Sequence, residues 1–326
     1  MKKVLPHMVP PARLKSARRA GDDYGVTDGP DWRGIDWSKH LHRIEIDGTQ
    51  VNYVDIGEQG DHRPIVFVHG LAGQWQNWLE NIPRFAEGRR VIALDLPGFG
   101  LSEMPSEEIS IEGYGRVLAE LGDRLDLNPA VLVGNSMGGF VSAEVSIRRP
   151  DSVERLLLLS SAGVSQMDVA KRPVLAAGKA AALLASSNAA QQQWIARRPT
   201  LRHAVLALVA RHPSRIASDM AFEGLMKGSA KPGFETALHA CLDYDFRDRL
   251  PQIGCPVLVV WGEKDAIIPV EDSDKFVELI EGARKIVIED TGHVPMVERP
   301  PTFNRILQEF LEHEVVEGEL EGELAV

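Results

Sequence analysis

One five-residue segment constrains the fold of this 326-residue chain more than any other. After the apolar run 131–133, the sequence has Gly-Asn-Ser-Met-Gly at 134–138, and an alanine-bearing helical stretch follows. A serine with a glycine two positions away on each side is typical of a sharp turn from a strand into a helix. The small neighbours leave room for a strained serine backbone, and the hydroxyl is exposed at the carboxyl edge of a sheet. The pattern predicts that Ser136 is a nucleophile; the alternative is a serine that only caps the helix.

Two later segments supply the groups that a nucleophilic serine needs. The apolar strand Pro256–Gly262 is followed by Asp265, and the strand Arg284–Glu289 is followed by His293. Both strand ends deliver their side chains to the same sheet edge as Ser136. The imidazole accepts the serine proton, while the carboxylate fixes its tautomer and stabilises its charged form. The chain order serine, aspartate, histidine is the one that this strand–turn–helix architecture uses.

Glu263 and Asp290 are rival carboxylates for the same role. Glu263 lies closer to the end of its strand, whereas Asp290 is too near His293 in sequence to reach the outer nitrogen of its ring. We therefore predict Asp265 as the partner of His293. A lone loop histidine is more often a surface residue, but the glycine before His293 and the two other groups favour catalysis.

A further buried strand, Pro64–Val68, runs into a glycine-containing loop that begins with His69 and Gly70. Acyl transfer builds negative charge on the former carbonyl oxygen, and backbone N–H groups fixed in place stabilise that charge best. We expect one donor to be the N–H of Met137 and the other to be the N–H of Leu71. His69 itself is interpreted as structural.

Further motifs are the turn Asp95–Ser102, the run Trp261–Asp265, and Gly292–Pro295 leading into Glu298–Pro300. Together with the serine turn, they resemble the α/β-hydrolase superfamily, in its serine-nucleophile branch with a helical cap (esterase- and lipase-like). The resemblance covers about residues 40–162 and 236–311. It implies an α/β fold with a mostly parallel central sheet, helices on both faces and an inserted helical cap. It says much less about the substrate, because this fold hosts many reactions.

Composition agrees with a soluble enzyme that has one large core. The apolar share of 44% and the charged share of 25% are ordinary, and the net charge of −11 argues against nucleic acid as a partner. Cys241 and Cys255 lack metal-ligand spacing, so we expect neither a disulfide framework nor a metal site. Prolines interrupt the segment after Met1 and no apolar run has transmembrane length. We therefore expect a cytoplasmic protein without stable membrane insertion.

Changes in composition divide the chain into five parts. Residues 1–30 are expected to form a flexible arm, and contact of its basic residues with a membrane surface is the alternative. Residues 31–162 and 236–311 form the two parts of the core, 163–235 a helical cap, and 312–326 an acidic tail. An antiparallel hairpin around Asp47-Gly48 opens the domain. The expected strands are Leu41–Ile46, Val51–Ile56, Pro64–Val68, Arg90–Leu94, Ala130–Val133, Arg155–Leu159, Pro256–Trp261 and Lys285–Ile288.

The cap is predicted from length, because about 95 residues separate two successive strands where a crossover needs only a helix and short loops. A helical cap over the active-site edge excludes water and shapes an apolar pocket. Trp75, Trp78 and Trp194 are candidate substrate-binding residues, with packing in the core as the alternative for each. Five cap arginines are either ligands for an acidic substrate group or part of a solvated helix face: Arg197, Arg198, Arg202, Arg211 and Arg215.

The function predicted first is hydrolysis of small or medium, largely apolar carboxylic esters, without metal or organic cofactor. Epoxide hydrolases and haloalkane dehalogenases of this fold carry an aspartate at the position of Ser136, so the serine argues against both activities. Carbon–carbon hydrolases of ring-cleavage products share the serine turn. However, they usually carry Pro-Gly in the oxyanion loop and a tryptophan after the histidine, where this chain has Leu71-Ala-Gly and Val294. Three alternatives to ester hydrolysis stay open: carbon–carbon bond hydrolysis, perhydrolase or acyltransferase activity, and a ligand receptor on the same fold. The sequence does not define the oligomeric state.

Overall fold

The computed structural model describes residues 17–18, 22–165, 188–227 and 232–312. Within them the core is a nine-stranded sheet of order β1-β9-β8-β7-β6-β4-β5-β3-β2. The strands β2, β3 and β5 pair antiparallel, and all other neighbours pair parallel. The strands are β1 Ala17–Arg18, β2 Leu41–Ile46, β3 Thr49–Ile56, β4 Ile65–Val68, β5 Val91–Leu94, β6 Ala130–Asn135, β7 Val153–Leu159, β8 Val257–Gly262 and β9 Arg284–Ile288.

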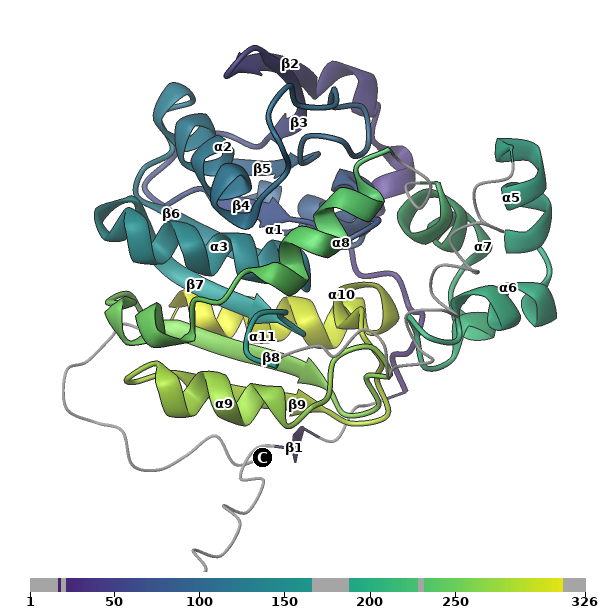
Figure 1. The fold of residues 1–326 in the computed structure, drawn as a ribbon. Coiled ribbons are helices and arrows are strands. Elements are labelled where there is room, and N and C mark those ends of the chain that lie inside the picture. Colours follow the sequence, from purple (N-terminus) through teal and green to yellow (C-terminus); the bar gives the residue numbers. More distant parts are fainter. Residues whose placement is uncertain (1–16, 19–21, 166–187, 228–231, 313–326) are drawn as a thin grey trace, which may run out of the picture.

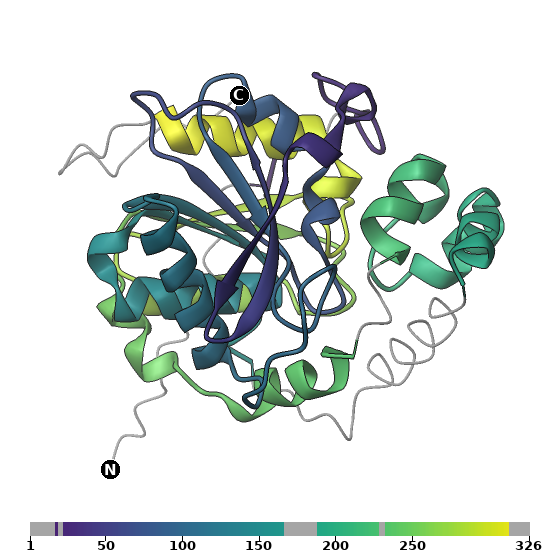
Figure 2. The same cartoon turned by 90° about the horizontal axis from the view of Figure 1, so that it is seen from above.

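Helices cover both faces of the sheet (Figures 1 and 2). The helices of the core are α1 Ile82–Ala86, α2 Ile111–Arg124, α3 Met137–Arg148, α9 Asp272–Leu279, α10 Pro295–Glu298 and α11 Pro300–Glu312. Short 3₁₀ helices are η1 Trp32–Gly34, η2 Trp37–Lys39, η3 Trp75–Trp78, η4 Pro150–Ser152 and η8 Arg247–Gln252. The mostly parallel sheet with helices on both faces that the sequence predicted is confirmed.

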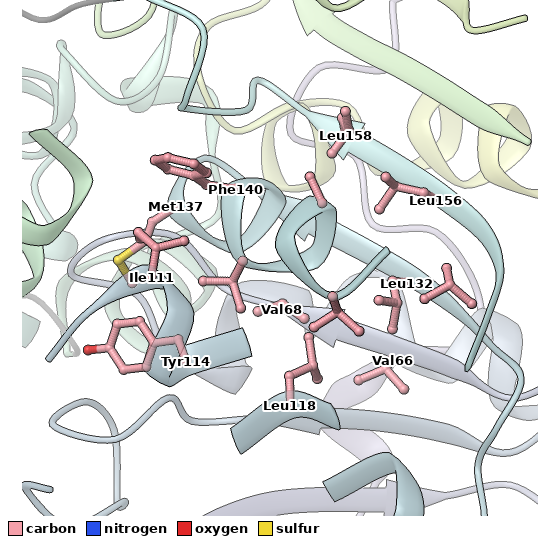
Figure 3. Packing of buried hydrophobic residues seen from close by; sticks show 14 of the residues in the cluster. Val66, Val68, Ile111, Tyr114, Leu118, Leu132, Met137, Phe140, Leu156 and Leu158 are labelled. Carbon is pink, nitrogen blue, oxygen red and sulfur yellow. The ribbon is translucent and has the colours of Figure 1, made fainter. Parts of the chain in front are cut away.

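The alternation of side chains along the strands explains the two covered faces. In β4, Val66 and Val68 pack with Leu118 of α2 and Phe140 of α3 in one apolar cluster (Figure 3). The intervening residues of β4 point to the opposite face, where α1 and α11 pack. Because strands of such a sheet are buried on both sides, they are continuous apolar runs, which is what made them predictable.

The chain enters the sheet through the predicted hairpin of β2 and β3. Asp47 and Gly48 have φ angles of 49° and 71°. Positive φ at both central residues is the geometry of the two-residue turn that matches the twist of paired strands. The strands from β4 onward then point their carboxyl ends toward one edge, where the serine turn lies.

A group of helices stands apart from the sheet at that edge (Figures 1 and 2). It comprises α5 Ala189–Ala196, α6 Pro199–Leu206, η6 Pro213–Arg215, α7 Ser218–Met220 and the π-helical turn η7 Ala221–Met226. The next helix, α8 Phe234–Asp243, returns to the core and continues across residue 235, where the sequence placed the end of the cap. No helix in the described ranges has both the length and the apolar character needed to cross a membrane.

The expectation of a flexible arm over residues 1–30 is wrong for its described part. Tyr24 is only 3% exposed, and Asp23 accepts hydrogen bonds from the side chains of Arg299 and Thr302. β1 pairs with β9 at the edge of the sheet. Composition favoured a solvated arm, but buried polar contacts with distant residues hold it. The predicted acidic tail lies outside the described residues, apart from Glu312 at the end of α11.

Candidate active site

Ser136 occupies the turn between β6 and α3. Its backbone has φ 55° and ψ −118°, a strained conformation that surrounding structure must impose. Glycines permit the turn: a Cβ on Gly134 would lie 2.3 Å from the carbonyl oxygen of Gly138, and one on Gly138 would lie 2.1 Å from that of Val68. Both positions therefore exclude every side chain. Ser136 itself is half-buried, so part of its surface stays open to solvent.

His293 follows β9, and its Nδ1 lies 2.7 Å from Oδ2 of Asp265, which follows β8. The Asp265 side chain has no exposed surface, and its Oδ1 accepts the N–H groups of Ile267 and Ile268 at 2.8 Å and 2.9 Å. These donors fix the carboxylate with one oxygen aimed at the ring. A proton on Nδ1 then completes the pair and leaves Nε2 as a base.

The rival carboxylates are engaged elsewhere. Asp290 lies 2.8 Å from Nε2 of His212 and 3.3 Å from Nε of Arg211. Glu263 accepts the N–H of Asp290 at 3.0 Å. The geometry therefore pairs His293 with Asp265, as the sequence predicted.

Asn135 links the serine turn to the histidine loop. Its side-chain amide donates to the carbonyl oxygen of Leu159 at 3.1 Å and to that of His293 at 3.2 Å. The residue directly before Ser136 is thus tied to the backbone of His293. The structure therefore brings Asp265 and His293 into direct contact and places the turn that carries Ser136 beside the histidine loop.

The loop after β4 runs beside the serine. A Cβ on Gly70 would lie 3.0 Å from the Cβ of Ser136, and Gly73 donates to the carbonyl of Gly70 at 2.9 Å to close a turn. Leu71 lies inside this turn. Met137 begins α3, where the first N–H groups of a helix have no intrahelical acceptor. Both N–H groups predicted for the oxyanion therefore belong to segments that border Ser136.

His69 is fully buried beneath this loop. Its Nε2 accepts the N–H of Leu96 at 3.0 Å, which assigns the proton to Nδ1, 2.8 Å from the carbonyl of Gly70. Burial lowers the pKa of His69 to about 4, so the ring is neutral at physiological pH. His69 thus connects the loop after β4 to the segment after β5.

Comparison with known proteins places this arrangement in a family. Residues 63–300 match the family model described as the alpha/beta hydrolase fold. The chain belongs to the α/β hydrolases. It is 34% identical over 278 residues to a dihydrolipoyllysine-residue acetyltransferase component of an acetoin cleaving system from Pseudomonas putida. That match covers 82% of this chain and 68% of the relative.

Two other similarities bear on the reaction of this α/β hydrolase. A 2-hydroxy-6-oxo-2,4-heptadienoate hydrolase from Pseudomonas putida is 30% identical, over 81% of this chain and 93% of the relative. Among solved structures, a bacterial membrane phospholipase A is 26% identical with a TM-score of 0.64, over 83% of this chain and 85% of that one. The relatives thus include enzymes that act on different bonds.

The candidate tryptophans of this hydrolase do not gather in one place. Trp78 has no exposed surface and stacks on Phe67 with ring centroids 4.7 Å apart. Trp75 is 3% exposed and lies 5.0 Å from Trp37. Trp194 is 52% exposed on the outer helix α5 (Figure 1). The packing favours the structural alternative for Trp75 and Trp78.

Four of the five candidate cap arginines are engaged in contacts within the protein. Arg202 is buried and donates to the carbonyl oxygens of Pro213 and Ser214 at 2.9 Å and 2.8 Å. Two others form ion pairs and one stacks on a ring: Arg211 with Asp290, Arg215 with Asp22, and Arg198 over Trp194. Arg197 is exposed.

Sequence reasoning assigned no role to one buried residue beside the histidine loop. Glu298 has no exposed surface, and it accepts hydrogen bonds from both neighbours of His293. The feature of the sequence that could have indicated Glu298 is its position directly after the apolar run 294–297. In the part of the chain that the structure describes, no group of three His, Cys, Asp or Glu side chains is placed to hold a metal ion.

Proposed function

We propose that this hydrolase cleaves small or medium, largely apolar carboxylic esters through an acyl-enzyme intermediate. The observation that carries the proposal is the His293–Asp265 pair, 2.7 Å apart, joined through Asn135 to the turn that presents Ser136. A serine with a base and an orienting carboxylate is the arrangement needed for acyl transfer at neutral pH.

The reaction has two halves. Ser136 Oγ attacks the ester carbonyl carbon while His293 Nε2 takes its proton, and the N–H groups of Leu71 and Met137 stabilise the oxyanion. His293 then gives the proton to the leaving alcohol. A water molecule, deprotonated by His293, attacks the acyl group, and the acid leaves as Ser136 regains its proton. Asp265 stabilises the charged imidazole in both halves.

Hydrolysis of a carbon–carbon bond is the second candidate. The 30% identity to a heptadienoate hydrolase and the shared Gly-Asn-Ser-Met-Gly-Gly segment favour it. The substrate in that relative's name is a carboxylate, which needs a cationic partner in the pocket. Of the five cap arginines considered for this purpose, Arg198, Arg202, Arg211 and Arg215 already contact other protein groups, and the fifth, Arg197, is exposed to solvent. A neutral ester has no such requirement, and for this reason it is placed first.

The test combines active-site labelling with a substrate panel. A fluorophosphonate should label Ser136, and Ser136→Ala should abolish labelling and lower hydrolysis of p-nitrophenyl esters by on the order of 10³-fold or more, because the triad acts as one unit. Ser106→Ala, at an exposed position, is the matched control and should leave both unchanged.

The outcomes separate the candidates. Turnover of a ring-cleavage dienoate without turnover of any ester would replace the first proposal by the second. Transfer of the acyl group to an added alcohol or thiol faster than to water would identify an acyltransferase. Labelling of another serine in the Ser136→Ala variant would overturn the nucleophile itself.

A further inference from the structure

Glu298 is a buried carboxylate in a position that the reaction does not explain. It ends α10, it has no exposed surface, and burial raises the pKa of its carboxyl group. Leaving a carboxylate in such a place costs several kcal/mol unless hydrogen bonds compensate. The groups that donate hydrogen bonds to Glu298 therefore indicate the role of its carboxylate.

Two of these donors flank the catalytic histidine. Oε2 of Glu298 accepts the N–H of Gly292 at 2.9 Å, and Oε1 accepts the N–H of Val294 at 3.2 Å. A Cβ on Gly292 would lie 2.9 Å from Oε1, so glycine is needed for this approach. The carboxylate thus fixes the peptide groups on both sides of His293.

The remaining donors come from two other segments. The N–H of Arg211 in the cap donates to Oε2 at 2.7 Å, and the hydroxyl of Tyr24 donates to the same oxygen at 2.5 Å. The Tyr24 oxygen in turn accepts the N–H of His212 at 2.7 Å. The N–H groups of two successive cap residues are therefore bound at this place, that of Arg211 by the Glu298 carboxylate and that of His212 by the Tyr24 hydroxyl.

Tyr24 is held tightly in this role. The guanidinium carbons of Arg215 and Arg299 lie 5.2 Å and 5.1 Å from the centroid of its ring. Burial raises the pKa of Tyr24, so the phenol keeps its proton and stays a donor. The next residue, Gly25, donates to the backbone carbonyl of Glu298 at 2.7 Å.

The cap also binds the histidine directly. The N–H of His293 donates to the carbonyl of Val209 at 3.0 Å, two residues before Arg211. Asn135 binds the His293 carbonyl from the other side. The backbone of the histidine loop is thus held between the serine turn, the cap and Glu298. Within the described residues, the hydrogen bonds of Glu298 go to backbone N–H groups and to Tyr24, and none goes to the imidazole ring.

We propose that Glu298 is a positioning residue for His293 and that Tyr24 supports it while joining the cap to the histidine loop. The proposal rests on the proposed triad function. Glu298 acts through the backbone of His293, so it sets how accurately the ring faces Ser136 and Asp265. A displacement of about 1 Å at a reacting group lowers rates by about 10²-fold.

Glu298→Gln keeps the shape but replaces one acceptor oxygen by an NH₂ donor. The glutamine side chain has one acceptor oxygen in place of two. It therefore cannot accept the N–H groups of both Gly292 and Val294 as the two carboxylate oxygens do, and one neighbour of His293 loses its partner. We expect kcat for esters to fall about 10- to 100-fold with KM within about threefold, and fluorophosphonate labelling of Ser136 to slow by the same factor as kcat. Tyr24→Phe removes one donor, and a fall of about three- to tenfold in both rates is expected.

Glu80→Gln is the matched control. Glu80 is 5% exposed, accepts the Nε1–H of Trp32 at 2.9 Å, and burial raises its pKa as well. Its replacement should lower the melting temperature without changing kcat or labelling. All rates are measured at one temperature, well below the melting temperature of the least stable variant, so that every protein is fully folded and a general loss of stability is separated from loss of positioning.

The outcomes are distinct from those of the proposed function. Wild-type protein that is labelled at Ser136 but cleaves no ester contradicts the ester proposal, while the labelling rates still test Glu298. Labelling of Glu298→Gln and Tyr24→Phe at the wild-type rate overturns the positioning role, as does an equal loss in Glu80→Gln. If Glu298→Gln does not fold, Tyr24→Phe decides the question. Wild-type protein that is not labelled overturns the proposal together with the triad.

Discussion

Asp265 uses its two carboxylate oxygens for two tasks. Oδ1 accepts the N–H groups of Ile267 and Ile268, and Oδ2 faces Nδ1 of His293. In Asp265→Asn, the amide oxygen must keep the place of Oδ1, so the NH₂ group is turned toward the ring. The ring then carries its proton on Nε2 and accepts none from Ser136. We expect kcat to fall roughly 10²- to 10⁴-fold at neutral pH, measured on the best ester of the panel.

Glu263→Gln is the control for this substitution. Glu263 is exposed and binds the N–H of Asp290, so its replacement should change kcat by less than about threefold. The assignment of Asp265 fails if Asp290→Asn or Glu263→Gln is the more damaging change.

The contact between Asp265 and His293 was predictable from the sequence, whereas the contacts of Glu298 were not. Ser136, Asp265 and His293 each follow an apolar strand in the required chain order, and that information is local. The hydrogen bond from Tyr24 to Glu298 joins positions 274 residues apart, and most of the other donors to Glu298 are backbone N–H groups, which every residue type except proline carries. No sequence pattern marks such a contact.

At the scale of elements, the strands from β2 to β9 were predicted to within two residues at each end. Most of the strands from β4 onward are apolar runs bounded by proline, glycine and charged residues, and burial on both faces keeps these runs continuous. The start of β3 moves from Val51 to Thr49, because the turn needs only Asp47 and Gly48. The two-residue β1 carries too short a pattern to predict. The helix α8 continues without a break across residue 235, where the sequence predicted the end of the cap.

The turn between β6 and α3 depends on space that only glycine leaves. A Cβ on Gly138 would lie 2.1 Å from the carbonyl of Val68 and 2.6 Å from that of His69, so Gly138→Ala forces α3 away from β4. Overpacking of this kind costs about 1–3 kcal/mol. We expect the free energy of unfolding to fall by that amount and labelling of Ser136 to slow. Gly60→Ala, where a Cβ meets nothing within 4 Å, should change neither.

At the scale of the whole molecule, the segment from Asp22 to Asp31 connects the outer group of helices to the core. Asp22 pairs with Arg215 of η6, and Asp23 pairs with Arg299 of the core. Arg33 lies just beyond this segment, where it binds both Asp31 and Asp219 of α7. Ion pairs therefore join segments from the first, middle and last parts of the described chain. Composition alone predicted a loose arm there, because it records charge but not the partner of each charge.

Buried titratable groups also make the global stability depend on pH, and His69 is the clearest case. Burial lowers the pKa of His69 from 6.5 to about 4 in the folded protein, so between these pH values the unfolded chain binds more protons. The contribution of His69 to stability is complete above pH 6.5 and is lost as the pH falls toward 4, by about 3 kcal/mol over the window. Glu298, whose pKa burial raises, acts with the opposite sign.

His69→Gln isolates this effect from that of Glu298. A glutamine oxygen can accept the N–H of Leu96 in place of Nε2, and the side chain does not titrate. Wild type should be the more stable protein at pH 7, and the difference in unfolding free energy should shrink as the pH is lowered to 4.5. Urea unfolding at pH 7, 5.5 and 4.5 measures this difference. A difference that stays constant across the three pH values would mean that His69 takes up its proton equally well in the folded and unfolded chain. It would then not be the neutral, buried link between the loops after β4 and β5.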